Sequence, residues 1–142
     1  RSDRMAEMAQ SLHWTSNIWM GVSIENSDYT YRIGHLRTVP AAVRFLSVEP
    51  MIGPIAQLPL LGIDWVVLGG ESGPGARPMA PSWARRVRDR CIRNGTPFFF
   101  KQWGGVNKKR SGRELDGRTW DQMPTAKTDK RRSKRRPMAT IG

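Results

Sequence analysis

Cysteine is almost absent from this chain of 142 residues, which has a single thiol at Cys91. One cysteine cannot form an internal disulfide, and alone it cannot supply the ligands of a tetrathiolate site or an iron–sulfur cluster. The two histidines, His13 and His35, have no companions at ligand-like spacing. The sequence therefore predicts no metal site.

Long hydrophobic runs are absent as well. The longest apolar stretches fall well short of the about 18 residues needed to cross a bilayer. Residues 1–10 are charged, unlike the basic-then-apolar leader of an exported protein. We therefore expect an unexported, cytoplasmic chain with no membrane partner.

Acidic residues are few, and the excess positive charge is unevenly placed. The formal net charge is +12, with 11 basic and 8 acidic residues in positions 1–100 but 13 and 4 in positions 101–142. The run at 127–136 has seven cations against Asp129 and no apolar period, so we expect a disordered tail. Such a tail can bind nucleic-acid phosphates in a salt-sensitive, sequence-blind way, and a solubilising role is the equally weighted alternative. The candidate nucleic-acid-binding residues are Lys127, Lys130, Arg131, Arg132, Lys134, Arg135 and Arg136.

Four apolar runs predict β-strands at residues 17–24, 43–49, 64–70 and 97–103. Helices are expected over residues 28–38 and 81–94, the first dozen residues have the pattern of a helix end, and prolines predict a loop over 51–62. Near-continuous apolar strands separated by helices or long crossovers indicate a parallel sheet covered on both faces. The predicted fold class is therefore α/β.

Four strands are half of an eight-stranded barrel, for which about 200 residues is the lower usual size. The chain starts with Arg1 in a helix end, so we expect an upstream part to be missing. Two architectures stay open at this point. One is an open four-stranded sheet, and the other is a half barrel completed by a partner or by a second copy of the chain.

Polar residues gather at the carboxyl edge, by which we mean the residues at the carboxyl ends of the four predicted strands. Glu25, Glu49 and Glu71 follow the first three strands, and Lys101 lies in the fourth. Ligands of parallel α/β folds bind at this edge, and glutamate is costly when buried without a partner. We predict a shared polar site there. The alternative is that these groups only solvate strand ends, with Lys101 bridging to one glutamate.

Glycine clusters in the turn after the third strand, at Gly69, Gly70, Gly73 and Gly75. Glycines permit close backbone approach, which suits a bound nucleotide or phosphate, but a tight turn between strand and helix is the favoured explanation. The cluster matches neither the dinucleotide-binding fingerprint nor the P-loop. Arg77 in the same loop is predicted either to clamp an anion or to be an ordinary surface arginine.

Four segments together resemble a known family. They are WMGVSIE at 19–25, AVRFLSVEP at 42–50 with Gly53-Pro54, WVVLGGESGPGARP at 65–78, and PFFFKQWG at 97–104. Together they resemble the C-terminal half of a phage-associated, radical S-adenosylmethionine-like family of unassigned function, found in bacterial genomes and prophages. The resemblance covers about 60% of the chain, between residues 17 and 103.

The resemblance implies a partial (βα) barrel at residues 1–123, with four predominantly parallel strands and flanking helices. The family's motifs do not extend beyond about Met123, and the disordered basic tail at 124–142 is predicted from its composition alone. It also implies a [4Fe-4S] cluster that cleaves S-adenosylmethionine, held by N-terminal cysteines that this chain lacks. We therefore expect the cluster only in a complete protein, and no catalysis from this chain alone. The resemblance implies cofactor binding by Ser23, Glu25, Glu49, Gly69, Gly70, Glu71, Ser72 and Gly73. It implies substrate binding by Arg77, Lys101, Gln102 and Trp103.

The competing hypothesis is a non-catalytic nucleic-acid-binding module that uses the basic tail. A third reading is a small anion-binding protein that dimerises into a full barrel.

Overall fold

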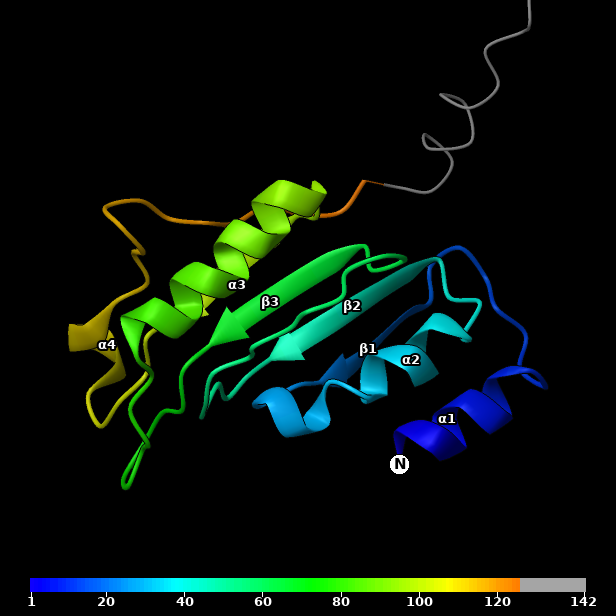
Figure 1. The fold of residues 1–142 in the computed structure, drawn as a ribbon, viewed down its shortest axis with the longest axis horizontal. Helices are drawn as coiled ribbons and strands as arrows, with labels where there is room; N and C mark the ends of the chain where they lie inside the picture. The colour runs from blue at the N-terminus through cyan, green and yellow to red at the C-terminus, as the bar shows by residue number, and fades with distance from the viewer. Residues whose placement is uncertain (126–142) are drawn as a thin grey trace, which may run out of the picture.

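The computed structural model describes residues 1–125 and shows a four-stranded sheet with helices packed against it (Figure 1). The expected tail lies outside the described residues from position 126 onward, so the predictions for its cations are not addressed. In chain order the elements are α1 (Ser2–Ala9), β1 (Trp19–Ser23), the 3-10 helix η1 (Ser27–Tyr29), α2 (Arg32–Arg37), β2 (Val43–Val48), β3 (Trp65–Gly69), α3 (Pro81–Asn94), β4 (Phe98–Gln102) and α4 (Lys108–Ser111).

The sheet confirms the α/β prediction. Its strands follow one another in space as they do in sequence, in the order β1-β2-β3-β4, and each neighbouring pair is parallel. All four carboxyl ends therefore lie along one edge of the sheet. The predicted strands extend one or two residues past the observed ones at one or both ends, because the prediction included flanking residues that lie outside the hydrogen-bonded ladder.

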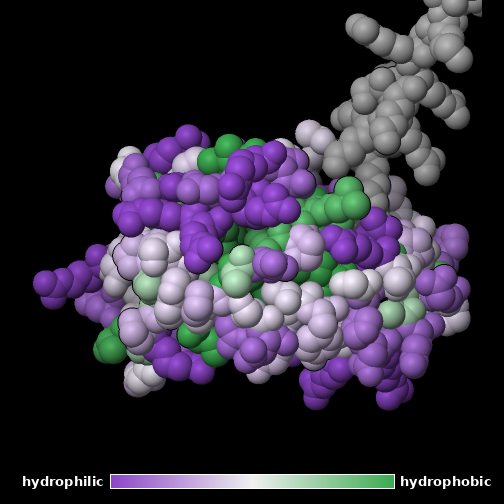
Figure 2. Space-filling model, in the orientation of Figure 1, coloured by the Kyte–Doolittle hydropathy of each residue, from purple (hydrophilic) through white to green (hydrophobic). Residues whose placement is uncertain are grey.

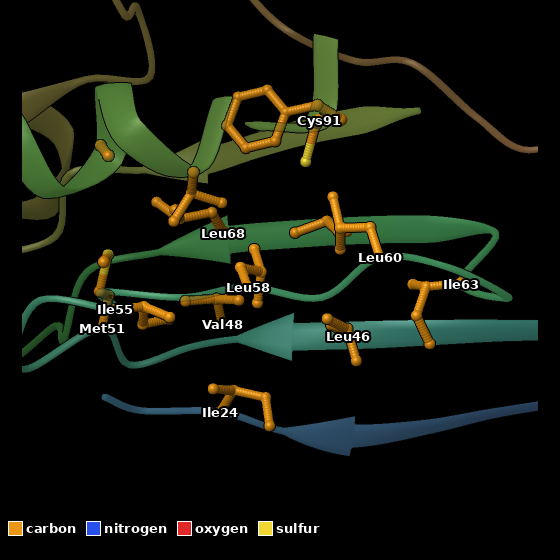
Figure 3. Close-up of a cluster of buried hydrophobic side chains, with 14 of the residues drawn as sticks. Ile24, Leu46, Val48, Met51, Ile55, Leu58, Leu60, Ile63, Leu68 and Cys91 are labelled. Atoms are coloured by element: carbon orange, nitrogen blue, oxygen red, sulfur yellow. The ribbon is translucent and has the colours of Figure 1, made fainter. Parts of the chain in front are cut away.

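Alternate strand residues form the core together with α2, α3 and the connection after β2. Ile24, Leu46, Leu68 and Phe100 point to the same side of the sheet and are fully buried. Leu58, Leu60 and Cys91 pack onto them from the connection and from α3 (Figure 3). The expected loop over 51–62 is confirmed, and its apolar side chains cover the sheet where a helix would otherwise lie.

The other side of the sheet, which we call the open face, corrects the expectation of a sheet covered on both faces. It carries Gly21, Ser23, Phe45, Ser47, Trp65, Val67 and Phe99, and none of these residues is buried. Trp19 is 41% exposed, and the Trp65 ring contacts the rings of Trp19, Phe45 and Phe99 with centroids 5.9–6.1 Å apart. The sequence analysis expected these large apolar side chains to be buried under a covering layer. In the structure the aromatic rings of this face instead pack against one another.

The two edges of the sheet differ. A short segment near the end of the described chain pairs antiparallel with β4, where Phe100 donates its N–H to the Trp120 carbonyl (2.7 Å) and Gln122 donates to Phe98 (3.2 Å). β1 is the other outer strand, and among residues 1–125 its one neighbour in the sheet is β2. A closed eight-stranded barrel made from two copies would need both edges, so this segment would have to leave β4.

The helices follow their sequence signals with one exception. α3 matches the predicted range, begins with Pro81 and ends at Gly95, whose φ of 70° is left-handed. The expected helix over 28–38 is instead split into η1 and α2. Asn26 caps η1 by accepting the Asp28 N–H (2.9 Å), as its position predicts. No helix in the described residues is long and apolar enough to span a membrane.

Gly70 should be intolerant of any side chain. A Cβ at this position would lie 1.8 Å from the Trp103 carbonyl oxygen, so we expect Gly70→Ala to lower the free energy of unfolding by at least about 2 kcal/mol. The matched control is Gly34→Ala in α2, where a Cβ would have nothing within 4 Å. That variant should gain about 0.5–1 kcal/mol from helix propensity. Urea unfolding measures both, and equal effects would contradict the close packing of β3 against the segment after β4.

Candidate functional site

Three ion pairs lie along the carboxyl edge, one for each glutamate that follows a strand. Glu25 pairs with Arg32, Glu49 with Lys101, and Glu71 with Arg77. The parallel order of the strands brings these pairs to one edge of the sheet, as the sequence predicted (Figure 1). Each carboxylate has its own cation, so the edge contains charges of both signs in alternation.

Glu49 is the most connected of the three. Lys101 Nζ donates to both carboxylate oxygens (3.1 and 3.2 Å), and Gln102 Nε2 donates to Oε1 (3.0 Å) and to the Gly70 carbonyl (3.3 Å). The Glu49 side chain lies against Gly69, where an added Cβ would be 3.2 Å from its carboxyl carbon. Gln102 is only 6% exposed, so its amide fixes the carboxylate. The predicted lysine bridge is therefore present, and Gln102 joins it.

Glu25 lies at the end of β1 beside a small cavity. Arg32 Nη1 donates to Glu25 Oε2 (3.2 Å) and to the Ser23 carbonyl (2.8 Å), and its guanidinium lies 4.4 Å from the Tyr29 ring centroid. A cavity of about 430 Å³ opens here, lined by Ser23, Glu25, Arg32 and Tyr31 among others. Its size is that of a small-molecule site, and its wall offers a carboxylate, a guanidinium and an aromatic face.

Glu71 and Arg77 form a closed pair within one loop. The guanidinium donates from Nε to Oε2 (2.8 Å) and from Nη2 to Oε1 (2.9 Å), and the Arg77 backbone N–H adds a third bond (2.9 Å). These hydrogen bonds from Arg77 lower the pKa of Glu71 from 4.5 to about 2. Arg77 is thus engaged by Glu71, and an anion would have to compete for it.

Backbone packing accounts for part of the glycine cluster. Gly70 donates to the Gln102 carbonyl (2.9 Å), Gly105 donates to Glu71 (2.7 Å), and Gly73 donates to Gly105 (3.1 Å). Ser72 pairs with Gly105 in a short parallel bridge. A Cβ on Gly104 would lie 2.2 Å from the Glu71 carbonyl oxygen. The tight-turn explanation is supported at Gly73 and Gly75, whose φ values of 104° and 72° are left-handed, whereas Gly70 is needed where two chain segments meet backbone to backbone.

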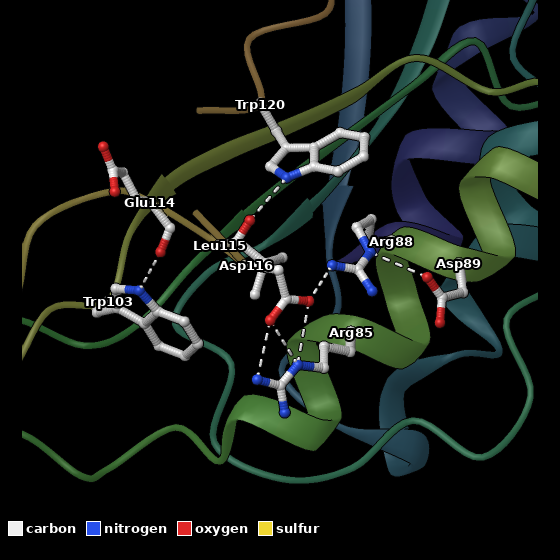
Figure 4. Close-up of polar contacts among 8 residues, drawn as sticks. All are labelled: Arg85, Arg88, Asp89, Trp103, Glu114, Leu115, Asp116 and Trp120. Atoms are coloured by element: carbon white, nitrogen blue, oxygen red, sulfur yellow. Dashed lines mark hydrogen bonds and ion pairs between the residues drawn. The ribbon is translucent and has the colours of Figure 1, made fainter. Parts of the chain in front are cut away.

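Trp103 lies apart from the other predicted substrate-binding residues. Its ring packs against Phe100 with centroids 5.0 Å apart, and its indole N–H donates to the Glu114 carbonyl (2.7 Å). The chain beyond it folds over α3, where Asp116 accepts from Arg85 and Arg88 (Figure 4). Trp103 helps to fix this segment, while Lys101 and Gln102 face Glu49.

The described residues do not fit an iron–sulfur cluster. No group of three or more His, Cys, Asp or Glu residues within positions 1–125 is placed to hold a metal ion. Cys91 is fully buried in α3, and burial raises the pKa of its thiol to about 12. A thiol that stays protonated in an apolar core is a poor metal ligand.

The comparison with protein families decides where this chain belongs. A family model described as "Protein of unknown function (DUF5131)" matches residues 1–124. The chain belongs to this family. No curated protein and no solved structure matches it. The part matched to DUF5131 includes all four strands and the three ion pairs of the carboxyl edge.

Sequence reasoning missed two groups of residues in this DUF5131 chain. Arg32 was not assigned, although it lies seven residues after Glu25 and could have been noted as the nearest cation. The arginines of α3 were also unassigned. Five of them stand against one aspartate in a helix of 14 residues, and that charge imbalance was the available signal.

Replacing Arg77 should release the Glu71 carboxyl. In the folded chain the pKa of Glu71 is lowered from 4.5 to about 2. The Glu71–Arg77 pair therefore stabilises the fold above pH 4.5, and that contribution disappears as the pH falls toward about 2. In Arg77→Gln we expect the pKa of Glu71 to rise toward 4.5, measured by NMR titration of the side-chain carboxyl carbon. Arg113→Gln, which removes an exposed cation near Phe99, is the control and should leave it unchanged. An unaltered titration in Arg77→Gln would show that the pair is absent in solution.

Proposed function

We propose that this DUF5131 chain is the C-terminal portion of a phage-associated, radical S-adenosylmethionine-like protein of the cytoplasm, and that its carboxyl edge binds S-adenosylmethionine. The observation that carries the proposal is the placement of Glu25, Glu49 and Glu71 after three adjacent parallel strands. Ligands of (βα) folds bind at this edge.

The chemistry of the edge suits such a ligand. S-adenosylmethionine carries an ammonium and a sulfonium charge, ribose hydroxyls that donate hydrogen bonds, and a carboxylate. Glu25 and Glu49 offer oxygens to the first three groups, and the cavity of about 430 Å³ beside Glu25 has room for part of the ligand. Under this proposal Lys101 and Gln102 lie on the substrate side, where Lys101 is exposed and can turn from Glu49 to an anionic group.

The proposal assigns binding and orientation to this chain and no redox step. The described residues do not provide ligands for a [4Fe-4S] cluster, so no reaction is routed through one. We accordingly expect the isolated chain to bind without turnover. The S-adenosylmethionine cofactor, the phage association and the cytoplasmic location are all parts of this proposal.

Isothermal titration calorimetry with S-adenosylmethionine tests the proposal. The chain should bind, and Glu49→Gln should weaken binding by about tenfold or more, since a hydrogen bond to a charged group contributes about 1.5–3 kcal/mol. Glu7→Gln, an exposed carboxylate on α1 away from the strand ends, is the matched control and should bind as the wild type does. Absence of binding heat, or equal binding by both variants, would contradict binding of S-adenosylmethionine at the carboxyl edge.

A second candidate function is nucleic-acid binding through the basic tail. The charge distribution favours it, because 13 of the 24 Lys and Arg residues lie in positions 101–142. Replacing the seven cations of residues 127–136 by glutamine should weaken binding of a labelled 20-nucleotide single strand, measured by fluorescence anisotropy. The slope of log affinity against log salt should become shallower by about 0.7 for each phosphate contact that is lost. An unchanged slope would exclude the tail as the contact.

A further inference from the structure

Helix α3 carries an unusual share of the positive charge. It contains five arginines and one aspartate, a net charge of +4 in 14 residues. The described residues 1–125 contain 17 Lys and Arg against 11 Asp and Glu, so α3 supplies most of their net charge of +6. Figure 2 shows the result as a hydrophilic band along the helix, next to a hollow with hydrophobic residues.

The arginines of α3 divide into two sets. Arg85 and Arg88 point toward the C-terminal segment, where both bind Asp116, and Arg88 also donates to Asp89 (Figure 4). Their charge is neutralised within the fold, and the bonds from these arginines lower the pKa of Asp116, Arg85 contributing most. The other three arginines of α3 are Arg86, Arg90 and Arg93.

Arg86, Arg90 and Arg93 line what we call the cationic groove, a cavity of about 670 Å³ between α3 and residues 55–59. They recur about once per helical turn on one side of α3. Arg90 donates to the Leu58 carbonyl (3.0 Å), which fixes its guanidinium against the opposite wall. Arg86 and Arg93 are exposed, and in the described part of the chain neither makes a hydrogen bond or an ion pair.

The groove combines aliphatic walls with three guanidinium groups. Its lining includes no aromatic residue on which a base could stack, so a nucleic acid would contact it through its backbone. Guanidinium groups bind phosphate oxygens in pairs, with geometry as well as charge.

The spacing fits a strand rather than a single phosphate. Arg86 and Arg93 are seven residues apart, which is about 10.5 Å along the helix axis. The guanidinium groups at the two ends of the groove can therefore each meet a different phosphate of one strand. Asp89 also lines the groove, but Arg88 pairs with it, so its carboxylate is compensated.

We propose that the cationic groove binds the phosphodiester backbone of a nucleic-acid strand, with Arg86 and Arg93 each holding a phosphate and Arg90 positioned between them. The site is separate from the carboxyl edge, so it stands whether or not S-adenosylmethionine binds. It deepens the second candidate function by giving the folded part of the chain a nucleic-acid contact of its own. Backbone contacts of this kind carry no sequence preference.

Anisotropy with a fluorescein-labelled 20-nucleotide single-stranded DNA tests the groove. The background is the full chain with the seven tail cations replaced by glutamine, which separates the groove from the tail. R86E/R93E should weaken binding at least tenfold and reduce the salt slope by about 1.4, the value for two phosphates on a single strand. The matched control is K108E/K109E, an equal charge reversal on the exposed α4, which should weaken binding less than threefold.

A second variant approaches the groove from its other wall. Gln57→Glu places a carboxylate opposite the arginines without altering them, and it should also weaken binding, whereas circular dichroism should show an unchanged fold for every variant. If R86E/R93E and K108E/K109E lost the same amount of DNA affinity, overall charge would explain the effect, and the proposal would be overturned. Competition by polyglutamate as effective as by unlabelled DNA would also overturn it, because an acidic peptide would then fill the same role. ATP that competes as well as unlabelled DNA at the same concentration of nucleotides would contradict binding of a strand and would indicate a site for free nucleotides.

Discussion

The Glu49 carboxylate connects β2 to β4 across the intervening strand. On its way to Lys101 and Gln102 it lies close against Gly69 in β3, where an added Cβ would be 3.2 Å from its carboxyl carbon. The buried amide of Gln102 ties the same carboxylate to the Gly70 carbonyl, where the chain leaves β3. Three strand ends are thereby fixed by one side chain, and the geometry of the carboxyl edge depends on it. A ligand at this edge would meet groups that are already positioned, at a smaller entropic cost than if they had to be ordered on binding.

Charge is sorted in this fold according to whether a partner lies within reach. Each glutamate of the carboxyl edge, costly to bury alone, has one cation, and Asp116 takes two arginines from α3. The arginines without an acidic partner on α3 lie in the cationic groove, and a second group of cations, Lys108, Lys109 and Arg110, lies on the exposed α4. The carboxyl edge, by contrast, is close to neutral.

Much of the fold could be predicted from the sequence because it depends on local patterns. Apolar runs located all four strands, with proline or glycine at the ends of three of them and polar helix-capping residues after the first, and Pro81 and Gly95 located both ends of α3. The gathering of Glu25, Glu49, Glu71 and Lys101 at one edge followed from parallel topology alone. Pairing partners did not follow, because long side chains choose among several cations and the choice depends on tertiary placement. Glu49 lies 52 residues from Lys101, and nothing local indicates that they meet.

Two features could not be predicted from the sequence, because they depend on how distant segments pack. The open face was predicted to be buried, because Phe45, Trp65 and Phe99 are apolar, and the sequence does not say that their mutual contacts replace a covering layer. The cationic groove needs α3 and residues 55–59 side by side, about thirty positions apart in the chain. An arginine-rich helix could have been noted from composition, but only the structure divides its arginines into neutralised and free sets.

The antiparallel segment on β4 has a consequence for assembly. Open-ended polymerisation by strand pairing needs two free sheet edges on every subunit, because each subunit must pair with one neighbour on either side. Within residues 1–125, the β4 edge is already occupied by residues 120–122 of the same chain, and only the β1 edge has no neighbouring strand. Edge-to-edge pairing of this part of the chain through β1 alone would be related by a twofold axis and would close on itself. Growth through β4 would first require residues 120–122 to leave that strand.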